Sequence, residues 1–203
     1  MVKVKICGIT NLEDALAAFF SGADAVGFVF YKKSPRYITL EKASRISKIL
    51  PKSIKRVGVF VNASESRIKK TARKCNLDML QFHGDEAVDF CFRFPGFKVI
   101  KAFRVSKEFD FSKVVKYKKC SFLFDGFLKN KYGGTGRRFD WSLLKDTLKI
   151  RREVFLSGGL NTSNVKKALK IVKPDWVDVS GGVELRPGIK SHKKIKEFIS
   201  LVK

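Results

Sequence analysis

The feature of this sequence that most limits its fold is a regular alternation of strand-like and helix-like segments along the chain. Short apolar runs predict strands, and longer amphipathic segments between them predict helices. The expected strands are Val2–Cys7, Ala25–Phe30, Arg56–Val61, Met79–Phe82, Lys98–Phe103, Ser121–Asp125, Val154–Ser157 and Trp176–Ser180. The expected helices are Leu12–Ser21, Leu40–Leu50, Glu65–Asn76, Glu86–Phe94, Phe111–Tyr117, Trp141–Leu148, Thr162–Val172 and His192–Val202. Such a succession of strand–helix units indicates an α/β fold.

Two architectures accommodate these units, a closed barrel and an open doubly wound sheet. The near-equal lengths of the units favour the barrel, and no G-x-G-x-x-G motif follows the first strand to indicate a dinucleotide-binding sheet. The chain has 203 residues and no linker or low-complexity stretch, so residues 1–203 are predicted to form a single (β/α)8 barrel domain. Cap residues support the boundaries: Asn11, Thr39, Ser64 and Asn161 at helix starts, and Gly22 at a helix end.

A closed barrel would gather polar residues that lie far apart in the sequence. In this architecture the C-terminal ends of all strands meet on one rim, and that rim carries the chemistry. The polar residues expected there are Cys7, Arg36, His83, Asp125, Ser157-Gly158-Gly159 and Ser180-Gly181-Gly182. We therefore expect one active site on this rim.

Cys7 and Asp125 are the candidates for acid–base chemistry. Cys7 ends the first strand and Gly8 permits a sharp turn, which places the thiol where a substrate could reach it; a buried cysteine is otherwise only a small apolar residue. Asp125 ends an apolar strand, where poor solvation favours a protonated carboxyl group that can act as an acid. The glycine-rich stretch 126–139 that follows is long for such a loop and predicts a mobile lid.

Two glycine pairs predict a phosphate site. Gly158-Gly159 and Gly181-Gly182 follow the seventh and eighth strands, where barrels of this kind usually bind phosphate. Glycine lets backbone N–H groups approach an anion, and a helix N-terminus adds partial positive charge. A single pair is explained equally well by a tight turn, whereas two in adjacent units favour a phosphate.

Arg36 and His83 are further candidates for binding substrate. Arg36 follows Ser34-Pro35, and a guanidinium group on a rigid turn suits a carboxylate or a phosphate. An ordinary surface arginine is an equally good explanation in so basic a chain. His83 shares a strand face with Gln81, and a lone histidine on the rim is more typical of a hydrogen-bonding neighbour than of a catalyst.

Composition narrows the cellular setting and the partners. No apolar run is long enough to span a bilayer, and lysines interrupt the N-terminal segment, so neither a membrane span nor a signal peptide is expected. The four cysteines form no C-x-x-C pair, so we expect no metal site and a reducing, cytoplasmic location. The net charge of +24 is the one feature that points to nucleic acid, but the basic residues are spread through helices, so no specific nucleic-acid partner is expected.

Motifs along the whole chain resemble those of the phosphoribosylanthranilate isomerase family. They are Lys5-Ile6-Cys7-Gly8-Ile9-Thr10, Gly22-Ala23-Asp24-Ala25-Val26-Gly27-Phe28, Ser34-Pro35-Arg36, Val57-Gly58-Val59-Phe60-Val61-Asn62, Gln81-Phe82-His83-Gly84, Gly133-Gly134-Thr135-Gly136, Phe139-Asp140-Trp141, Ser157-Gly158-Gly159-Leu160-Asn161 and Asp178-Val179-Ser180-Gly181-Gly182-Val183-Glu184. So many motifs in order make a chance resemblance very improbable.

The resemblance implies an Amadori rearrangement of N-(5-phosphoribosyl)anthranilate in tryptophan biosynthesis, with no metal or organic cofactor. It implies that Cys7 is the general base, that Asp125 is the general acid and that Arg36 holds the anthranilate carboxylate. The substrate-binding set expected from it is Arg36, His83, Gly158, Gly159, Asp178, Ser180 and Gly181. The only expected partner is a small phosphorylated substrate, bound by a monomer or a homodimer.

Two departures from the family pattern are visible. Gly181 stands where the family usually has a second serine, so a hydroxyl group is missing and weaker phosphate binding is expected. Phe82 stands where leucine is common, and only repacking is expected on the helix-facing side of its strand.

Strand alternation gives one expectation beyond the resemblance. Lys5 should point into the barrel on the same side as Cys7, and closure should place it beside Asp178. Because a buried ammonium group requires a partner, we expect a Lys5–Asp178 pair whose positive charge favours the Cys7 thiolate.

Two alternatives remain open from the residues alone. Another sugar-phosphate barrel, such as a ribulose-phosphate epimerase or the histidine-pathway isomerase, would typically place carboxylates where this chain has the Cys7–Asp125 pair. A nonenzymatic basic RNA-binding barrel would bind RNA with a steep salt dependence that survives loss of both residues.

Overall fold

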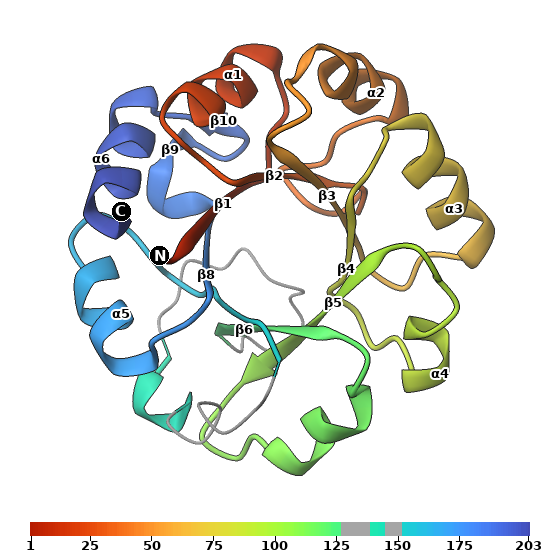
Figure 1. Ribbon diagram of the computed structural model, residues 1–203, viewed down its shortest axis with the longest axis vertical. Coiled ribbons are helices and arrows are strands. Elements are labelled where there is room, and N and C mark those ends of the chain that lie inside the picture. Colours follow the sequence, from red (N-terminus) through yellow and green to blue (C-terminus); the bar gives the residue numbers. More distant parts are fainter. Residues whose placement is uncertain (127–138, 145–151) are drawn as a thin grey trace.

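A computed structural model, which describes residues 1–126, 139–144 and 152–203, shows a closed parallel barrel surrounded by helices (Figure 1). The barrel strands follow in chain order and each pairs with the next, with β8 closing on β1. They are β1 (Lys3–Cys7), β2 (Ala25–Val29), β3 (Lys55–Phe60), β4 (Met79–Phe82), β5 (Lys98–Val105), β6 (Ser121–Gly126), β7 (Val154–Leu156) and β8 (Trp176–Val179). The expected α/β barrel is confirmed, and each expected strand lies within two residues of its predicted bounds.

The helices form the outer layer of the molecule. The α-helices are α1 (Leu12–Phe20), α2 (Leu40–Ile49), α3 (Glu65–Lys74), α4 (Val88–Cys91), α5 (Val165–Val172) and α6 (His192–Val202). Short 3-10 helices span η1 (Phe111–Tyr117) and η3 (Gly181–Val183), and a two-stranded ribbon, β9 (Glu184–Arg186) with β10 (Ile189–Lys190), lies outside the barrel sheet. The side chains of Asn11, Thr39 and Ser64 accept hydrogen bonds from the first turns of α1, α2 and α3, as predicted.

Several predicted helices differ from the structure. The helix expected at Glu86–Phe94 is only the single turn α4, because Glu86 folds back to accept hydrogen bonds from the backbone N–H groups of Asn62 and Gly84. Helix α5 begins at Val165, since Asn161 caps the preceding turn through the N–H of Ser163. The segment Phe111–Tyr117 is a 3-10 helix. The predicted lid residues 127–138, and residues 145–148 of the predicted helix Trp141–Leu148, lie outside the described residues.

Inside the barrel, an apolar layer supports a polar one. The lower layer consists of Ala25, Val57, Met79, Ile100, Ala102, Leu123, Phe155 and Trp176. Two positions beyond Met79 on β4 and Trp176 on β8, the alternation of side chains brings Gln81 and Asp178 to the interior, where they are buried together with Lys5 of β1. The outward faces of the strands pack against the helices; Phe82, for example, lies among Phe60, Phe90 and Phe94.

Three aspartates connect neighbouring strands at the base of the barrel through side-chain hydrogen bonds. Asp24, Asp78 and Asp175 stand immediately before β2, β4 and β8, and each carboxylate accepts a hydrogen bond from a backbone N–H of the preceding strand at 2.8–2.9 Å. Since they lie at the end opposite the rim that carries the chemistry, we assign them to stability.

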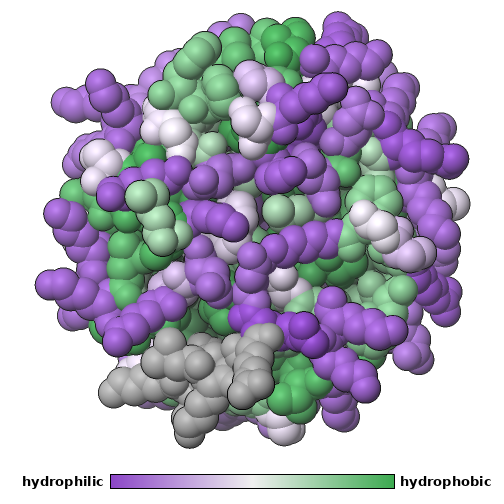
Figure 2. Space-filling model, in the orientation of Figure 1, coloured by the Kyte–Doolittle hydropathy of each residue, from purple (hydrophilic) through white to green (hydrophobic). Residues whose placement is uncertain are grey.

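The surface is polar over most of the face shown in Figure 2, and its hydrophilic side chains do not gather into one stripe. This agrees with the spread of lysine and arginine along the sequence. Among the described residues, no helix combines the length and apolarity that a membrane crossing requires.

Candidate active site

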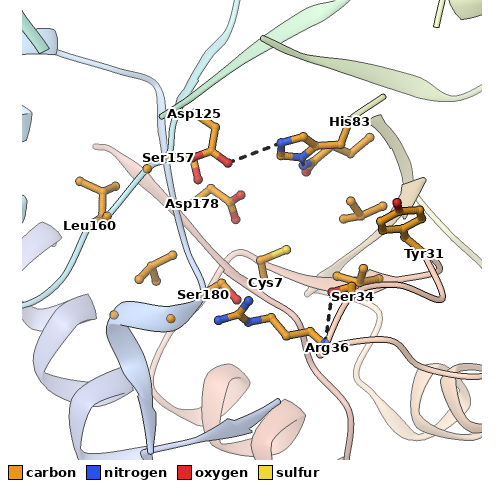
Figure 3. Close-up of a pocket in the computed structure, with 18 of the residues that line it drawn as sticks. Cys7, Tyr31, Ser34, Arg36, His83, Asp125, Ser157, Leu160, Asp178 and Ser180 are labelled. Atoms are coloured by element: carbon orange, nitrogen blue, oxygen red, sulfur yellow. Dashed lines mark hydrogen bonds and ion pairs between the residues drawn. The ribbon is translucent and has the colours of Figure 1, made fainter. Parts of the chain in front are cut away.

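The C-terminal rim of the barrel contains a cavity that brings the predicted residues together (Figure 3). Every member of the predicted site set lines it: Cys7, Arg36, His83, Asp125, Gly158, Gly159, Asp178, Ser180 and Gly181. They come from β1, β6, β8 and the loops that follow β2, β4, β7 and β8. Val29, Val59 and Tyr31 pack around Cys7 and form an apolar wall.

The Cys7 thiol is accommodated by a glycine on the neighbouring strand. Cys7 lies directly across from Gly27 in the β1–β2 register, and a Cβ atom at position 27 would come within 2.8 Å of Cys7 Sγ and 3.2 Å of Lys5 Cε. Any larger side chain on this inward face of β2 would therefore displace the thiol. Glycine is unfavourable in a strand interior, but at position 27 it leaves room for the thiol.

Lys5 lies beneath Cys7 and makes the predicted ion pair. Its Nζ donates to Asp178 Oδ1 at 2.8 Å, its side chain is fully buried, and the two residues are register neighbours across the β1–β8 closure. Burial opposes the charge on Lys5, but Asp178 and Cys7 outweigh it and raise the lysine's pKa. The protonated, positively charged form of Lys5 is therefore favoured inside the barrel.

Burial is the largest influence on the Cys7 thiol and raises its pKa; the charge of Asp178 adds to this effect, whereas Lys5 and Lys190 lower the pKa. The expected contribution of Lys5 thus has the predicted sign. The net result is different from the prediction, however, because the pKa lies above its usual value. The cations limit the rise that desolvation causes rather than reversing it.

Asp125 lies opposite His83 at the mouth of β6. Its Oδ1 accepts from the N–H of Gly126 at 2.8 Å, and its Oδ2 lies 3.5 Å from His83 Nε2. Gln81 Nε2 lies 3.0 Å from His83 Nδ1. With this amide orientation the glutamine donates to Nδ1, and the imidazole proton sits on Nε2, facing the carboxyl group. His83 is thus oriented by Gln81 toward Asp125, as a neighbour that would support an anionic carboxylate.

The first glycine pair has a backbone that only glycine adopts readily. Gly158 and Gly159 both have positive φ, 87° and 66°. Gly182 is required for a different reason: a Cβ atom there would lie 1.9 Å from the carbonyl oxygen of Leu160, so the β7 and β8 loops touch through their backbones. The two pairs therefore form one continuous wall of the cavity.

Sequence reasoning missed two charged residues behind this wall. Glu184 binds Arg36 through two hydrogen bonds, Oε1 to Nε at 2.9 Å and Oε2 to Nη2 at 2.7 Å, and Lys190 Nζ lies 2.8 Å from Glu184 Oε1. Burial opposes ionisation of Glu184, yet the hydrogen bonds and charges of Arg36 and Lys190 prevail and lower its pKa. Burial lowers the pKa of Lys190. Only the position of Glu184, as the last residue of the motif that begins at Asp178, could have drawn attention to its role.

Comparison with known proteins agrees with this geometry. The family model for N-(5'-phosphoribosyl)anthranilate isomerase matches residues 4–201. The chain belongs to this isomerase family. The N-(5'-phosphoribosyl)anthranilate isomerase of Thermotoga neapolitana is 50% identical over 204 residues, which cover 100% of this chain and 99% of the relative.

Solved structures of phosphoribosylanthranilate isomerases superpose closely. The Thermotoga maritima isomerase has a TM-score of 0.93 at 48% identity, with 99% of this chain and 98% of that chain covered. An isomerase in complex with reduced 1-(o-carboxyphenylamino)-1-deoxyribulose 5-phosphate has a TM-score of 0.90 at 48% identity, with 98% and 97% covered. Family membership separates this chain from the epimerase and RNA-binding alternatives. In the part of the chain that the structure describes, no group of three or more His, Cys, Asp or Glu side chains could hold a metal ion.

Proposed function

We propose that this isomerase converts N-(5-phosphoribosyl)anthranilate to 1-(2-carboxyphenylamino)-1-deoxyribulose 5-phosphate, with Asp125 as the general acid and Cys7 as the general base. The observation that carries the assignment is that Cys7 and Asp125, 118 positions apart in the printed sequence, line one cavity together with both glycine pairs. A thiol and a carboxyl group on one cavity are the two proton-transfer groups that an Amadori rearrangement requires.

The first step is opening of the sugar ring. Asp125 donates a proton to the furanose oxygen, the C1–O bond breaks, and the nitrogen lone pair forms a C1=N iminium. His83 Nε2, 3.5 Å from Asp125 Oδ2, is placed to stabilise the carboxylate that remains. Asp125 is only 4% exposed, so little water competes for its carboxylate. A hydrogen bond from His83 therefore stabilises the carboxylate more than it would at the surface.

The second step is removal of the proton at C2. The iminium acidifies this position, and the Cys7 thiolate takes the proton to give an enolamine, which tautomerises to the ketone. The cation of Lys5 stabilises the thiolate beside it, and that of Lys190 acts in the same direction. Arg36 would bind the anthranilate carboxylate, while Gly158, Gly159, Gly181 and Ser180 would bind the phosphate; we place Asp178 among the substrate contacts as well as in the pair with Lys5.

Turnover is tested by generating phosphoribosylanthranilate in situ and following the fall in its fluorescence. Wild-type protein should consume the substrate, and product should accumulate in equal amount. If folded wild-type protein gave no turnover, the assigned reaction would be wrong for this chain.

Replacing Lys5 by methionine should move the acid limb of the pH profile of kcat/KM to higher pH by about one pH unit. The sign follows from the environment: Lys5 lowers the pKa of Cys7 and Asp178 raises it, so removing the cation leaves less thiolate at any given pH. The rate of iodoacetamide alkylation of Cys7 against pH measures this directly. In the double variant Lys5→Met with Asp178→Asn, the acid limb of the kcat/KM profile should return toward its wild-type position, because the anion that raises the pKa of Cys7 is also removed. An unchanged alkylation profile in Lys5→Met would contradict the role given to the cation.

Replacing Gly181 by serine should tighten binding of inorganic phosphate by about tenfold, since a hydrogen bond to a charged group contributes about 1.5 kcal/mol. A Cβ atom at this position would lie 3.2 Å from Arg36 Nη2, so the arginine must shift slightly. Gly181→Ala introduces the same crowding without the hydroxyl group and is the matched control. Calorimetric titration with phosphate distinguishes them, and equal affinities in the two variants would show that the hydroxyl adds nothing.

The partner we propose is this phosphorylated small molecule, and a nucleic acid is not required. We propose that the chain acts as a monomer or a homodimer. We also propose a cytoplasmic location, supported by the four cysteines, which are all free and buried.

A further inference from the structure

Glu184, which has no role in the proposed reaction so far, is the centre of a buried charge cluster with Arg36 and Lys190. It binds Nε and Nη2 of Arg36 through separate oxygens, which fixes the plane of the guanidinium group rather than only its position. Its Oε1 also receives the N–H of Gly188 at 3.2 Å and Nζ of Lys190 at 2.8 Å. Both oxygens of the carboxylate are therefore engaged.

Lys190 connects this carboxylate to the two loops on either side of it. Its side chain is fully buried, and its Nζ lies 2.5 Å from the carbonyl oxygen of Cys7 and 3.3 Å from both the carbonyl oxygen and Oγ of Ser180. The ribbon β9–β10 brings Glu184 and Lys190 together, because the two residues are register partners across it. Through Glu184 and Lys190, the ribbon therefore connects the guanidinium group of Arg36 to the backbone at the ends of β1 and β8.

Neither Glu184 nor Lys190 lines the cavity, whereas Arg36, Cys7 and Ser180 all do. Arg36, Glu184 and Lys190 are at most 9% exposed. Burying two cations and an anion carries a desolvation penalty that such pairs often fail to recover, so stability alone is a poor reason for the arrangement. A rigid arginine, by contrast, binds a planar carboxylate with little loss of side-chain entropy.

We propose that Glu184 is a positioning residue that sets the selectivity of the site for a substrate carrying a carboxylate, acting through the guanidinium of Arg36 and anchored by Lys190. The inference rests on the proposed function, in which Arg36 binds the anthranilate carboxylate. It predicts that Glu184 contributes to affinity only for ligands that have this group and only while Arg36 is present.

Two stable ligands test the proposal. One is reduced 1-(o-carboxyphenylamino)-1-deoxyribulose 5-phosphate, and the other is the same molecule with phenyl in place of carboxyphenyl. The dissociation constant of the phenyl ligand divided by that of the carboxyphenyl ligand measures the contribution of the carboxylate to affinity. Glu184→Gln should lower this ratio by about tenfold relative to wild type, as expected for loss of a charged bidentate partner. Arg36→Ala should lower it further, and adding Glu184→Gln to Arg36→Ala should change it no more.

A second buried pair provides the matched control. Glu86 also binds a buried lysine, Lys101, at 2.8 Å and accepts backbone N–H groups, and like Glu184 it lies outside the cavity lining. Glu86→Gln should leave the ligand ratio unchanged whatever it does to thermal stability. Glu184→Asp keeps the charge and should lower the ratio less than Glu184→Gln, which provides the test if the glutamine variant does not fold.

The outcomes separate this proposal from the proposed function. If Glu184→Gln weakens both ligands equally, or if its effect persists in full without Arg36, the residue is structural and the positioning role is wrong. If wild-type protein fails to prefer the carboxylate ligand, or does not turn over phosphoribosylanthranilate, the assignment of Arg36 or of the reaction itself has failed instead.

Discussion

Replacing Cys7 by alanine is expected to lower kcat by about a thousandfold, within the range that a positioned general base contributes. Without the sulfur the proposed base is gone, and C2 must lose its proton to water. The loss should fall on kcat much more than on KM, because the binding contacts that we propose for the phosphate and the carboxylate come from other residues. Steady-state measurement of both constants with in situ substrate checks this.

Cys7→Ser separates the chemistry of the thiol from its shape. An alcohol of nearly the same size fits the space opposite Gly27, but it ionises far less readily, so its activity should stay close to that of the alanine variant. Serine activity within tenfold of wild type would show that proton abstraction by Cys7 does not limit the reaction.

The second large effect is expected for Asp125→Asn, which should also lower kcat by about a thousandfold. An amide keeps an oxygen that can accept from the Gly126 N–H, so the backbone contact at 2.8 Å can persist. It cannot, however, deliver a proton to the furanose oxygen. Substrate should therefore bind and remain in its closed form, which a single-turnover experiment would detect as unchanged anthranilate fluorescence.

Asp175→Asn is the matched control for this change. Asp175 is another aspartate that accepts a backbone N–H, from Val154 at 2.8 Å, but it lies at the opposite end of the barrel. Its replacement should lower the melting temperature and leave kcat near the wild-type value. Equal kcat losses in the two variants would attribute the Asp125 effect to general destabilisation.

The barrel and most of its rim could be predicted because periodicity and chain order determine them. Strand alternation fixed which side chains point inward, and closure fixed which strands are neighbours, so the Lys5–Asp178 pair followed from the sequence and is present at 2.8 Å. The net effect on Cys7 did not follow. It depends on how far burial opposes the thiolate, which is a property of the packed interior and not of the sequence pattern.

The errors share a cause, which is that side chains folded back onto the backbone. Glu86 has a good helix-forming side chain at the start of a helix-like segment, but it binds the N–H groups of neighbouring loops and Lys101 instead. Glu184 and Lys190 were missed because the ribbon that pairs them has only a few residues and no clear alternation. Contacts of this kind depend on the tertiary structure and have no local signature.

The aspartates at the base of the barrel lie at strand pairs whose backbone ladders are short. The strand pairs that they fasten have short ladders, with three register pairs for β1–β2, four for β3–β4 and two for β7–β8. The remaining consecutive pair of this kind, β5–β6, has six register pairs and, among the described residues, no such aspartate. A carboxylate therefore adds one hydrogen bond at the base of each of these three short ladders, whereas β4–β5 and β6–β7, with four and three register pairs, have no such aspartate among the described residues.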